Sequence, residues 1–147
     1  MNKGEKAASL FHDGYNCAQA VVLAFADESG LDEKTLCKLA SSFGGGMGRM
    51  REVCGSVSGM LMILGLIKGY DSPYDRDGKA ETYRVVQELA EAFKEVHGSI
   101  VCREILKKPN GKDHYQPAER TKQYYDERPC EHCVKTAANI LENFLKN

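Results

Sequence analysis

The sequence of 147 residues contains no tryptophan, only four prolines and no excess of charge of either sign. So few prolines argue against proline-rich recognition segments and long disordered linkers. The 20 basic and 21 acidic residues give a net charge of −1, which argues against nucleic acid and anionic membrane surfaces as partners. The composition is otherwise typical of a soluble globular protein. The length predicts one domain over residues 1–147.

Long hydrophobic segments are also missing. The segment 53–67 carries no charge over fifteen residues, whereas a membrane-spanning helix needs about 20 apolar residues. We interpret this segment as part of a buried central helix. The first residues contain neither an uninterrupted apolar run nor a cleavage pattern for secretion. The sequence therefore predicts a cytoplasmic protein that does not span a membrane and keeps its thiols reduced.

The pattern of apolar residues predicts an all-α bundle of five to seven helices. Apolar residues recur at spacings of three and four, and the period of two that is typical of strands is nearly absent. Asn16, Asp32 and Ser99 are expected as N-caps, and Pro129 is expected at a first helical position. Residues 108–126 are expected to be mostly loop. The expected helices are 6–12, 17–28, 33–43, 51–68, 78–97, 100–107 and 129–145.

Six cysteines stand out in this otherwise average composition. Three or four of them fall in the first turn of an expected helix, namely Cys17, Cys102, Cys130 and Cys133. The positive end of the helix dipole favours a thiolate over a thiol there. Because thiolates are the nucleophilic and metal-binding form, these positions indicate chemistry. Cys37, inside an amphipathic helix, is expected to pack as a small apolar side chain.

Cys130 and Cys133 form the only C-x-x-C pair. Covalent haem attachment would need histidine at the position that Val134 occupies, so no haem is expected. A thioredoxin-like motif would need a βαβ context that this helical sequence lacks. Half of a zinc or iron–sulfur site, completed by other cysteines, remains open. His132, inside the pair, is the histidine expected to serve as a spare ligand or proton carrier. The others, His12, His97 and His114, are expected to be ordinary polar residues.

The glycine run 44–48 lacks the lysine and the preceding strand of a phosphate-binding loop, so it is expected to provide a sharp backbone turn. Gly55 and Gly59 share one face of the expected central helix. A face of small residues admits either a bound cofactor or a second helix, and both alternatives stay open. The arginines that follow the run or lie beside a cysteine could add positive potential, but are expected to be solvated: Arg49, Arg51 and Arg103.

Several segments resemble the C_GCAxxG_C_C family of redox-active proteins. The matching residues are 16–20 (NCAQA), 43–50 (FGGGMGRM), 52–55 (EVCG), 98–104 (GSIVCRE) and Cys130 with Val134, Ala137 and Ala138. The resemblance covers about residues 6–145. It implies that Cys17, Cys54, Cys102 and Cys130 are the family cysteines and that Cys37 and Cys133 are additions. It also implies a relation to the iron–sulfur part of split-Soret cytochromes. A further implication is that the gene lies near genes for transporters.

We therefore expect one catalytic site built from Cys17, Cys54, Cys102 and Cys130. With Cys133 as a further ligand, these residues would bind an iron–sulfur cluster or another thiophilic metal such as zinc and transfer electrons. Gly55 and Gly59 would make room for that cofactor. One alternative is a metal-free thiol–disulfide redox protein. Another is a non-enzymatic zinc-binding or transporter-associated module. The expected partners are a redox partner, a transporter or a second copy of the chain in a homodimer. The sequence leaves open whether the protein is an oxidoreductase.

Overall fold

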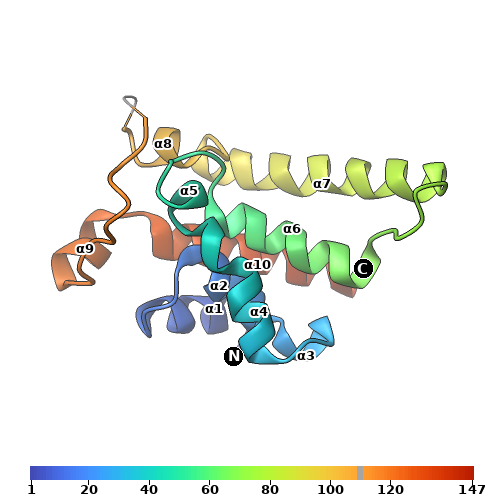
Figure 1. The fold of residues 1–147 in the computed structure, drawn as a ribbon, viewed down its shortest axis with the longest axis horizontal. Helices are drawn as coiled ribbons and strands as arrows, with labels where there is room; N and C mark the ends of the chain where they lie inside the picture. The colour runs from blue at the N-terminus through green and yellow to red at the C-terminus, as the bar shows by residue number, and fades with distance from the viewer. Residues whose placement is uncertain (109–110) are drawn as a thin grey trace.

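The computed structural model describes residues 1–108 and 111–147, and within them every regular element is helical (Figure 1). The expected all-α class is confirmed. The described helices of eight residues or more fall within the expected five to seven: α1 (Lys3–His12), α2 (Cys17–Ala24), α4 (Glu33–Ala40), α6 (Gly55–Lys68), α7 (Arg76–His97) and α10 (Cys130–Lys146). None of the described helices has the length and apolar character needed to cross a membrane.

Shorter elements connect these helices. They are α3 (Ala26–Ser29), the 3₁₀ helix η1 (Ser41–Phe43), α5 (Gly44–Met47), α8 (Cys102–Ile105) and α9 (Lys122–Glu127). Figure 1 shows α5, α8, α9 and the beginning of α10 at one end of the molecule. The candidate site lies at this end.

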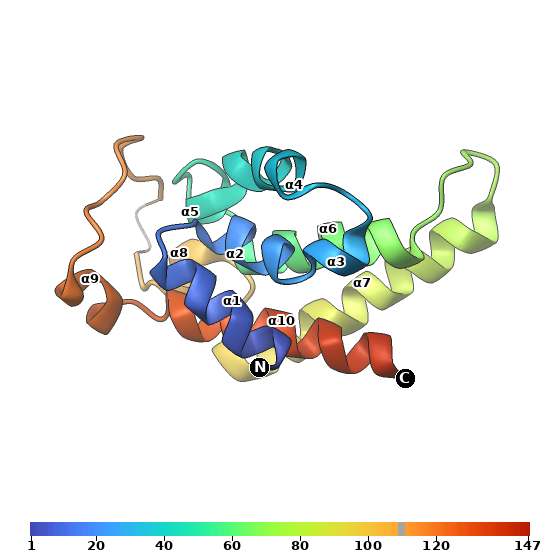
Figure 2. The ribbon, with the colours of Figure 1, turned by 90° about the horizontal axis from the view of Figure 1, so that it is seen from below.

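The core forms around α2 and α6, which pack against each other. Figure 2 shows them between α4 on one side and α1 and α10 on the other. Nearly every side chain of α2 is buried, and α6 buries Val57, Met60, Ile63 and Leu64. Burial of such apolar surface is the main driving force of folding. The expected buried central helix with glycines is thus α6.

Local side-chain caps explain where the helices begin. The Asn16 side chain accepts a hydrogen bond from the backbone N–H of Gln19, and the Gln19 side chain accepts one from the backbone N–H of Asn16, so the expected start of α2 is confirmed. Asp32 caps α4 as expected. Asn2 and Glu5 form a second capping box, which starts α1 earlier than expected.

Other expected boundaries are wrong for local reasons. The expected helix 17–28 breaks at Phe25, whose backbone is not helical. The expected helix 51–68 begins only at Gly55, with Cys54 as its N-cap. Ser99 does not cap α8, because its hydroxyl accepts from Val101 N–H and Val101 is the cap. Pro129 lies at the N-cap of α10, one residue before the expected place.

Candidate functional site

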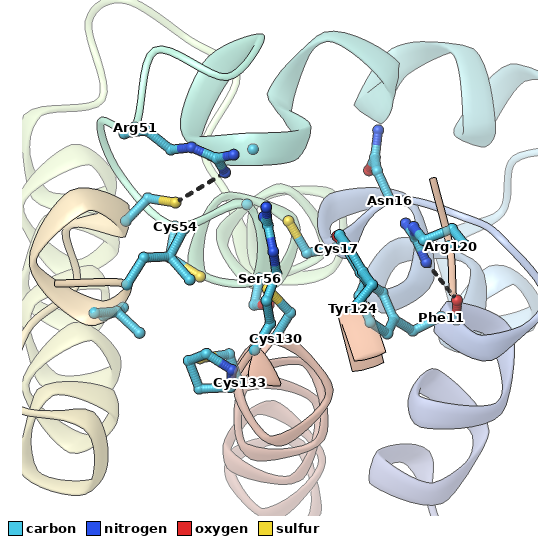
Figure 3. A pocket seen from close by; sticks show the side chains of 17 residues that line it. Phe11, Asn16, Cys17, Arg51, Cys54, Ser56, Arg120, Tyr124, Cys130 and Cys133 are labelled. Carbon is cyan, nitrogen blue, oxygen red and sulfur yellow. Dashed lines mark hydrogen bonds between the residues drawn. The ribbon is translucent and has the colours of Figure 1, made fainter. Parts of the chain in front are cut away.

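Five of the six cysteines line one cavity of about 60 Å³ (Figure 3). They belong to the beginnings of four helices: Cys17 is the first residue of α2, Cys54 the N-cap of α6, Cys102 the first residue of α8, and Cys130 and Cys133 lie in the first turn of α10. The structure thus brings together all the cysteines that the sequence proposes for the site. Cys37 lies on α4, outside the cavity.

A short antiparallel backbone contact places Cys54 beside Cys102. Val53 and Val101 form an isolated β-bridge. Next to it, the N–H of Cys54 donates to the carbonyl of Ile100 at 2.8 Å, and the N–H of Cys102 donates to the carbonyl of Glu52 at 2.6 Å. This contact joins the beginnings of α6 and α8, so two cysteines far apart in the sequence face the same cavity.

The two glycines of the α6 face have different surroundings. Gly55 lines the cavity, and a Cβ there would collide with Sγ of Cys17. Gly59 does not line the cavity, and a Cβ there would lie 2.8 Å from the carbonyl oxygen of Ala18. The close approach of α2 to α6 therefore accounts for Gly59 without a cofactor.

The glycine run lets the chain close over the cysteines. Gly45, Gly46 and Gly48 all have positive φ, as do three residues that are not glycine: Met47, Arg49 and Arg51. A Cβ on Gly46 would lie 2.7 Å from Cβ of Cys102. Such clusters of left-handed residues are costly and tend to occur at functional sites. The run is a tight turn over the cavity, as the sequence predicts.

Arg51 is a buried charge at the edge of this cavity, with 3% of its surface exposed. Its Nη1 donates to Sγ of Cys102 at 3.7 Å, and its Nε donates to Oδ2 of Asp113 at 2.8 Å. The pKa of Asp113 is lowered to about 2, chiefly by this hydrogen bond. The expectation that Arg51 is a solvated surface charge is wrong, because the turn 44–51 folds its side chain inward.

Cys54 is the thiol that ionises most easily. A hydrogen bond from the Cys133 thiol, together with the backbone N–H groups of Ser56 and Val57 at the beginning of α6, outweighs burial and lowers the pKa of Cys54 to about 7. The pKa of Cys133 is raised, first because its proton is held by Cys54 and then because of burial. Cys54 and Cys133 thus share one proton near neutral pH.

The remaining cysteines of the cavity keep their protons. Burial and neighbouring cysteines raise the pKa of Cys17 to about 12 and that of Cys130 to about 11. Burial also raises the pKa of Cys102, although Arg51 acts against it. The prediction of a thiolate at a helix beginning therefore fails for these three, since desolvation outweighs the helix dipole. It fails for Cys133 as well, whose pKa is also raised.

Reasoning from the sequence missed the role of His97. Its Nδ1 lies 3.7 Å from Sγ of Cys133, and its Nε2 lies 3.0 Å from Oγ1 of Thr136. Burial, and then the nearby His132, lower the pKa of His97. His132 packs its ring against His97 but is exposed and does not line the cavity. No sequence spacing connects His97 with Cys133, because only the packing of α7 against α10 brings them together.

A comparison with family models identifies the chain. The model described as "Putative redox-active protein (C_GCAxxG_C_C)" matches residues 15–144. The chain belongs to this family. Comparisons with curated proteins and with solved structures gave no match. The matched residues include all five cysteines of the cavity, so the family's redox description concerns the part of the chain that contains it.

A redox-active protein of the C_GCAxxG_C_C family could use its thiols directly or through a metal. Among the described residues, no group of three or more His, Cys, Asp or Glu side chains is placed to hold a metal ion. The cysteines in this arrangement therefore do not form a ready set of ligands for a single metal ion such as zinc. The metal hypothesis stays a prediction.

Proposed function

We propose that this protein is a metal-free thiol–disulfide redox protein in which Cys54 is the attacking thiolate and Cys133 the second thiol. The observation that carries the proposal is the placement of the pair: Cys54 and Cys133 line one cavity, and hydrogen bonding by Cys133 lowers the pKa of Cys54 to about 7. A thiol with a pKa near the ambient pH combines a high thiolate fraction with good nucleophilicity. The three other cysteines of the cavity stay protonated and leave Cys54 as the reactive one.

The reaction is two successive thiol–disulfide exchanges. The Cys54 thiolate attacks one sulfur of a substrate disulfide, forms a mixed disulfide and releases the other sulfur as a thiolate. Cys133 then loses its proton, attacks Sγ of Cys54 and releases the second substrate thiolate. The product is a Cys54–Cys133 disulfide, and two electrons have passed to the substrate. A dithiol reductant returns the protein to its starting state.

His97 can accept the proton in the second exchange. Once Cys54 is in a mixed disulfide, it no longer carries the negative charge that holds the Cys133 proton. Nδ1 of His97 is then the nearby basic atom, 3.7 Å from Sγ of Cys133. Because burial lowers the pKa of His97, the imidazole is neutral at pH 7 and able to act as a base.

The test is to identify which cysteines react. Reduced protein is exposed at neutral pH to a limiting amount of a small disulfide and analysed by peptide mass spectrometry. We expect the first adduct at Cys54, followed by a Cys54–Cys133 disulfide. Cys37→Ser, outside the cavity, serves as the matched control and should behave as the wild type. Adducts that avoid Cys54, or an oxidised protein without the Cys54–Cys133 bond, would contradict the proposal.

An iron–sulfur or other metal centre is the second candidate, favoured by the five sulfur atoms around one cavity. A single metal ion would need the thiols to rearrange, since the described side chains form no group placed to hold one. Protein purified without oxygen should be assayed for iron, sulfide and zinc. Stoichiometric metal that is lost in Cys54→Ser and kept in Cys37→Ser would replace the thiol–disulfide proposal.

A further inference from the structure

A second cavity of about 330 Å³ adjoins the cysteine cavity, and we call it the outer cavity. The two cavities share six lining residues: Asn16, Gly45, Arg51, Arg120, Tyr124 and Arg128. A molecule in the outer cavity would therefore contact residues that also line the cysteine cavity. The volume falls at the small end of the range for ligand sites, which is roughly 300–1,000 Å³.

The charged side chains around both cavities are all of one kind. Arginine supplies every charged lining residue in the described part of the chain: Arg49, Arg51, Arg120 and Arg128. No aspartate, glutamate or lysine of the described residues lines either cavity. The chain as a whole carries 21 acidic residues and a net charge of −1, so this positive region is a local feature.

The four arginines differ in whether a carboxylate compensates their charge. Arg51 and Arg49 are compensated, because they pair with Asp113 at 2.8 and 3.8 Å. Arg120 and Arg128 have no carboxylate within ion-pair distance among residues 1–108 and 111–147.

Arg120 and Arg128 are nevertheless held in place. Arg120 donates to the carbonyl oxygens of Phe11 and Tyr15, both at 2.9 Å (Figure 3 shows the Phe11 contact). The ring of Tyr124 contacts both guanidinium groups, with its centre 5.0 Å from Arg120 and 4.5 Å from Arg128. Neutral partners thus fix the two side chains without cancelling their charge.

We propose that the outer cavity binds small disulfides that carry carboxylate groups. Arg120 and Arg128 hold a carboxylate, and the sulfur–sulfur bond extends to Cys54. Arginine suits carboxylates because its planar N–H groups match the two oxygens. The exchange is that of the proposed function, on which this inference rests: Cys54 binds one substrate sulfur, and the other half leaves as a carboxylate-bearing thiolate that takes a proton from water.

The test compares three disulfides that share one S–CH₂–CH₂ unit and differ in the charge at its end. They are 3,3′-dithiodipropionate (anionic), bis(2-hydroxyethyl) disulfide (neutral) and cystamine (cationic). The rate of mixed-disulfide formation at Cys54 is divided by the rate of the same reagent with a cysteine peptide, and we call this ratio the corrected rate. We expect the corrected rate to be highest for dithiodipropionate and lowest for cystamine, with the difference shrinking as salt is added.

Matched variants assign this preference to the outer cavity. Arg128→Gln should lower the ratio of the dithiodipropionate rate to the hydroxyethyl disulfide rate by about fivefold, the effect of losing one partly exposed charge contact. Arg128→Lys should keep part of the preference. Arg84→Gln removes the same charge from an exposed site on α7 that lines neither cavity, and should leave the ratio unchanged.

The outcomes separate the two proposals. Equal corrected rates for the three reagents, or an equal effect of Arg84→Gln and Arg128→Gln, would overturn carboxylate recognition and leave the proposed function standing. If no reagent modifies Cys54, the proposed function is wrong.

Suberate, a dicarboxylate of the same chain length as dithiodipropionate but without a disulfide, then tests the outer cavity alone. Binding measured by calorimetry and weakened in Arg128→Gln supports recognition, and its absence overturns it.

Discussion

Cys133, at the beginning of α10, and Cys54, at the beginning of α6, line the same cavity, and hydrogen bonding by Cys133 is the first cause of the lowered pKa of Cys54. The pair that we propose to react therefore joins two helices and differs from the C-x-x-C pair. Cys130, the first cysteine of that motif, has a pKa raised to about 11 and remains a thiol. Among the five cysteines of the cavity, Cys54 is thus the one whose pKa is lowered.

Removing Cys133 should make Cys54 less acidic. In Cys133→Ala the largest cause of the low pKa is gone, so we expect the pH midpoint of Cys54 alkylation to rise from about 7. A rise of one unit lowers the thiolate fraction at pH 7 from half to about a tenth, and the rate falls about fivefold. Iodoacetamide labelling across pH measures this, with Cys37→Ala as control. An unchanged midpoint would show that Cys133 does not tune Cys54.

Replacing His97 should slow only the second exchange. In His97→Gln the mixed disulfide on Cys54 should form at the wild-type rate, because Cys54 is already ionised. Its conversion to the Cys54–Cys133 disulfide should slow by about 100-fold or more, the loss expected for a general base. Quenched-flow mass spectrometry follows both steps. His114→Gln, at an exposed residue, is the control, and equal slowing of both steps in His97→Gln would refute the assignment.

Two glycines of α6 should respond oppositely to alanine. In Gly59→Ala the new Cβ meets the carbonyl oxygen of Ala18 at 2.8 Å, and the overpacking should lower the free energy of unfolding by about 1–3 kcal/mol. At Gly65 a Cβ has no neighbour within 4 Å, so alanine should stabilise by about 0.5–1 kcal/mol. Urea unfolding measures both. An unchanged free energy of unfolding in Gly59→Ala would contradict this account of the close approach of α2 to α6.

Alkaline pH should destabilise the fold through Cys17 and Cys130. Their folded pKa values, about 12 and about 11, lie above the ordinary thiol value of 9.0. From pH 9 upward the unfolded chain therefore binds fewer protons than the folded protein, and the free energy of unfolding falls. Cys54 acts oppositely between pH 7 and 9, because its folded pKa of about 7 lies below 9.0.

Urea unfolding at pH 7, 9 and 11 checks this prediction. Cys130→Ala should flatten the loss of stability above pH 9, whereas Cys37→Ala should keep it. A wild-type protein that is as stable at pH 11 as at pH 9 would contradict it.

Much of the fold can be predicted from the sequence because its causes are local. The spacing of apolar residues indicates helices, and Asn16 and Asp32 mark helix beginnings through hydrogen bonds within three residues. The same locality places Cys17 and Cys130 at helix beginnings. Boundaries fail where the backbone departs from helical geometry for longer-range reasons, as at Cys54, which is fixed by pairing with Ile100.

The sequence by itself determined that the chain is helical, that small residues face one side of α6 and that its cysteines cluster at helix beginnings. Only the tertiary structure decided which thiol is acidic. Desolvation raises the pKa of Cys17 and Cys130, while a proton from Cys133 lowers that of Cys54. Both effects depend on neighbours distant in sequence. The burial of Arg51 and the contact of His97 with Cys133 have the same physical origin. The packing of the helices, and not the spacing along the chain, determines how far apart two side chains lie and how much water reaches them.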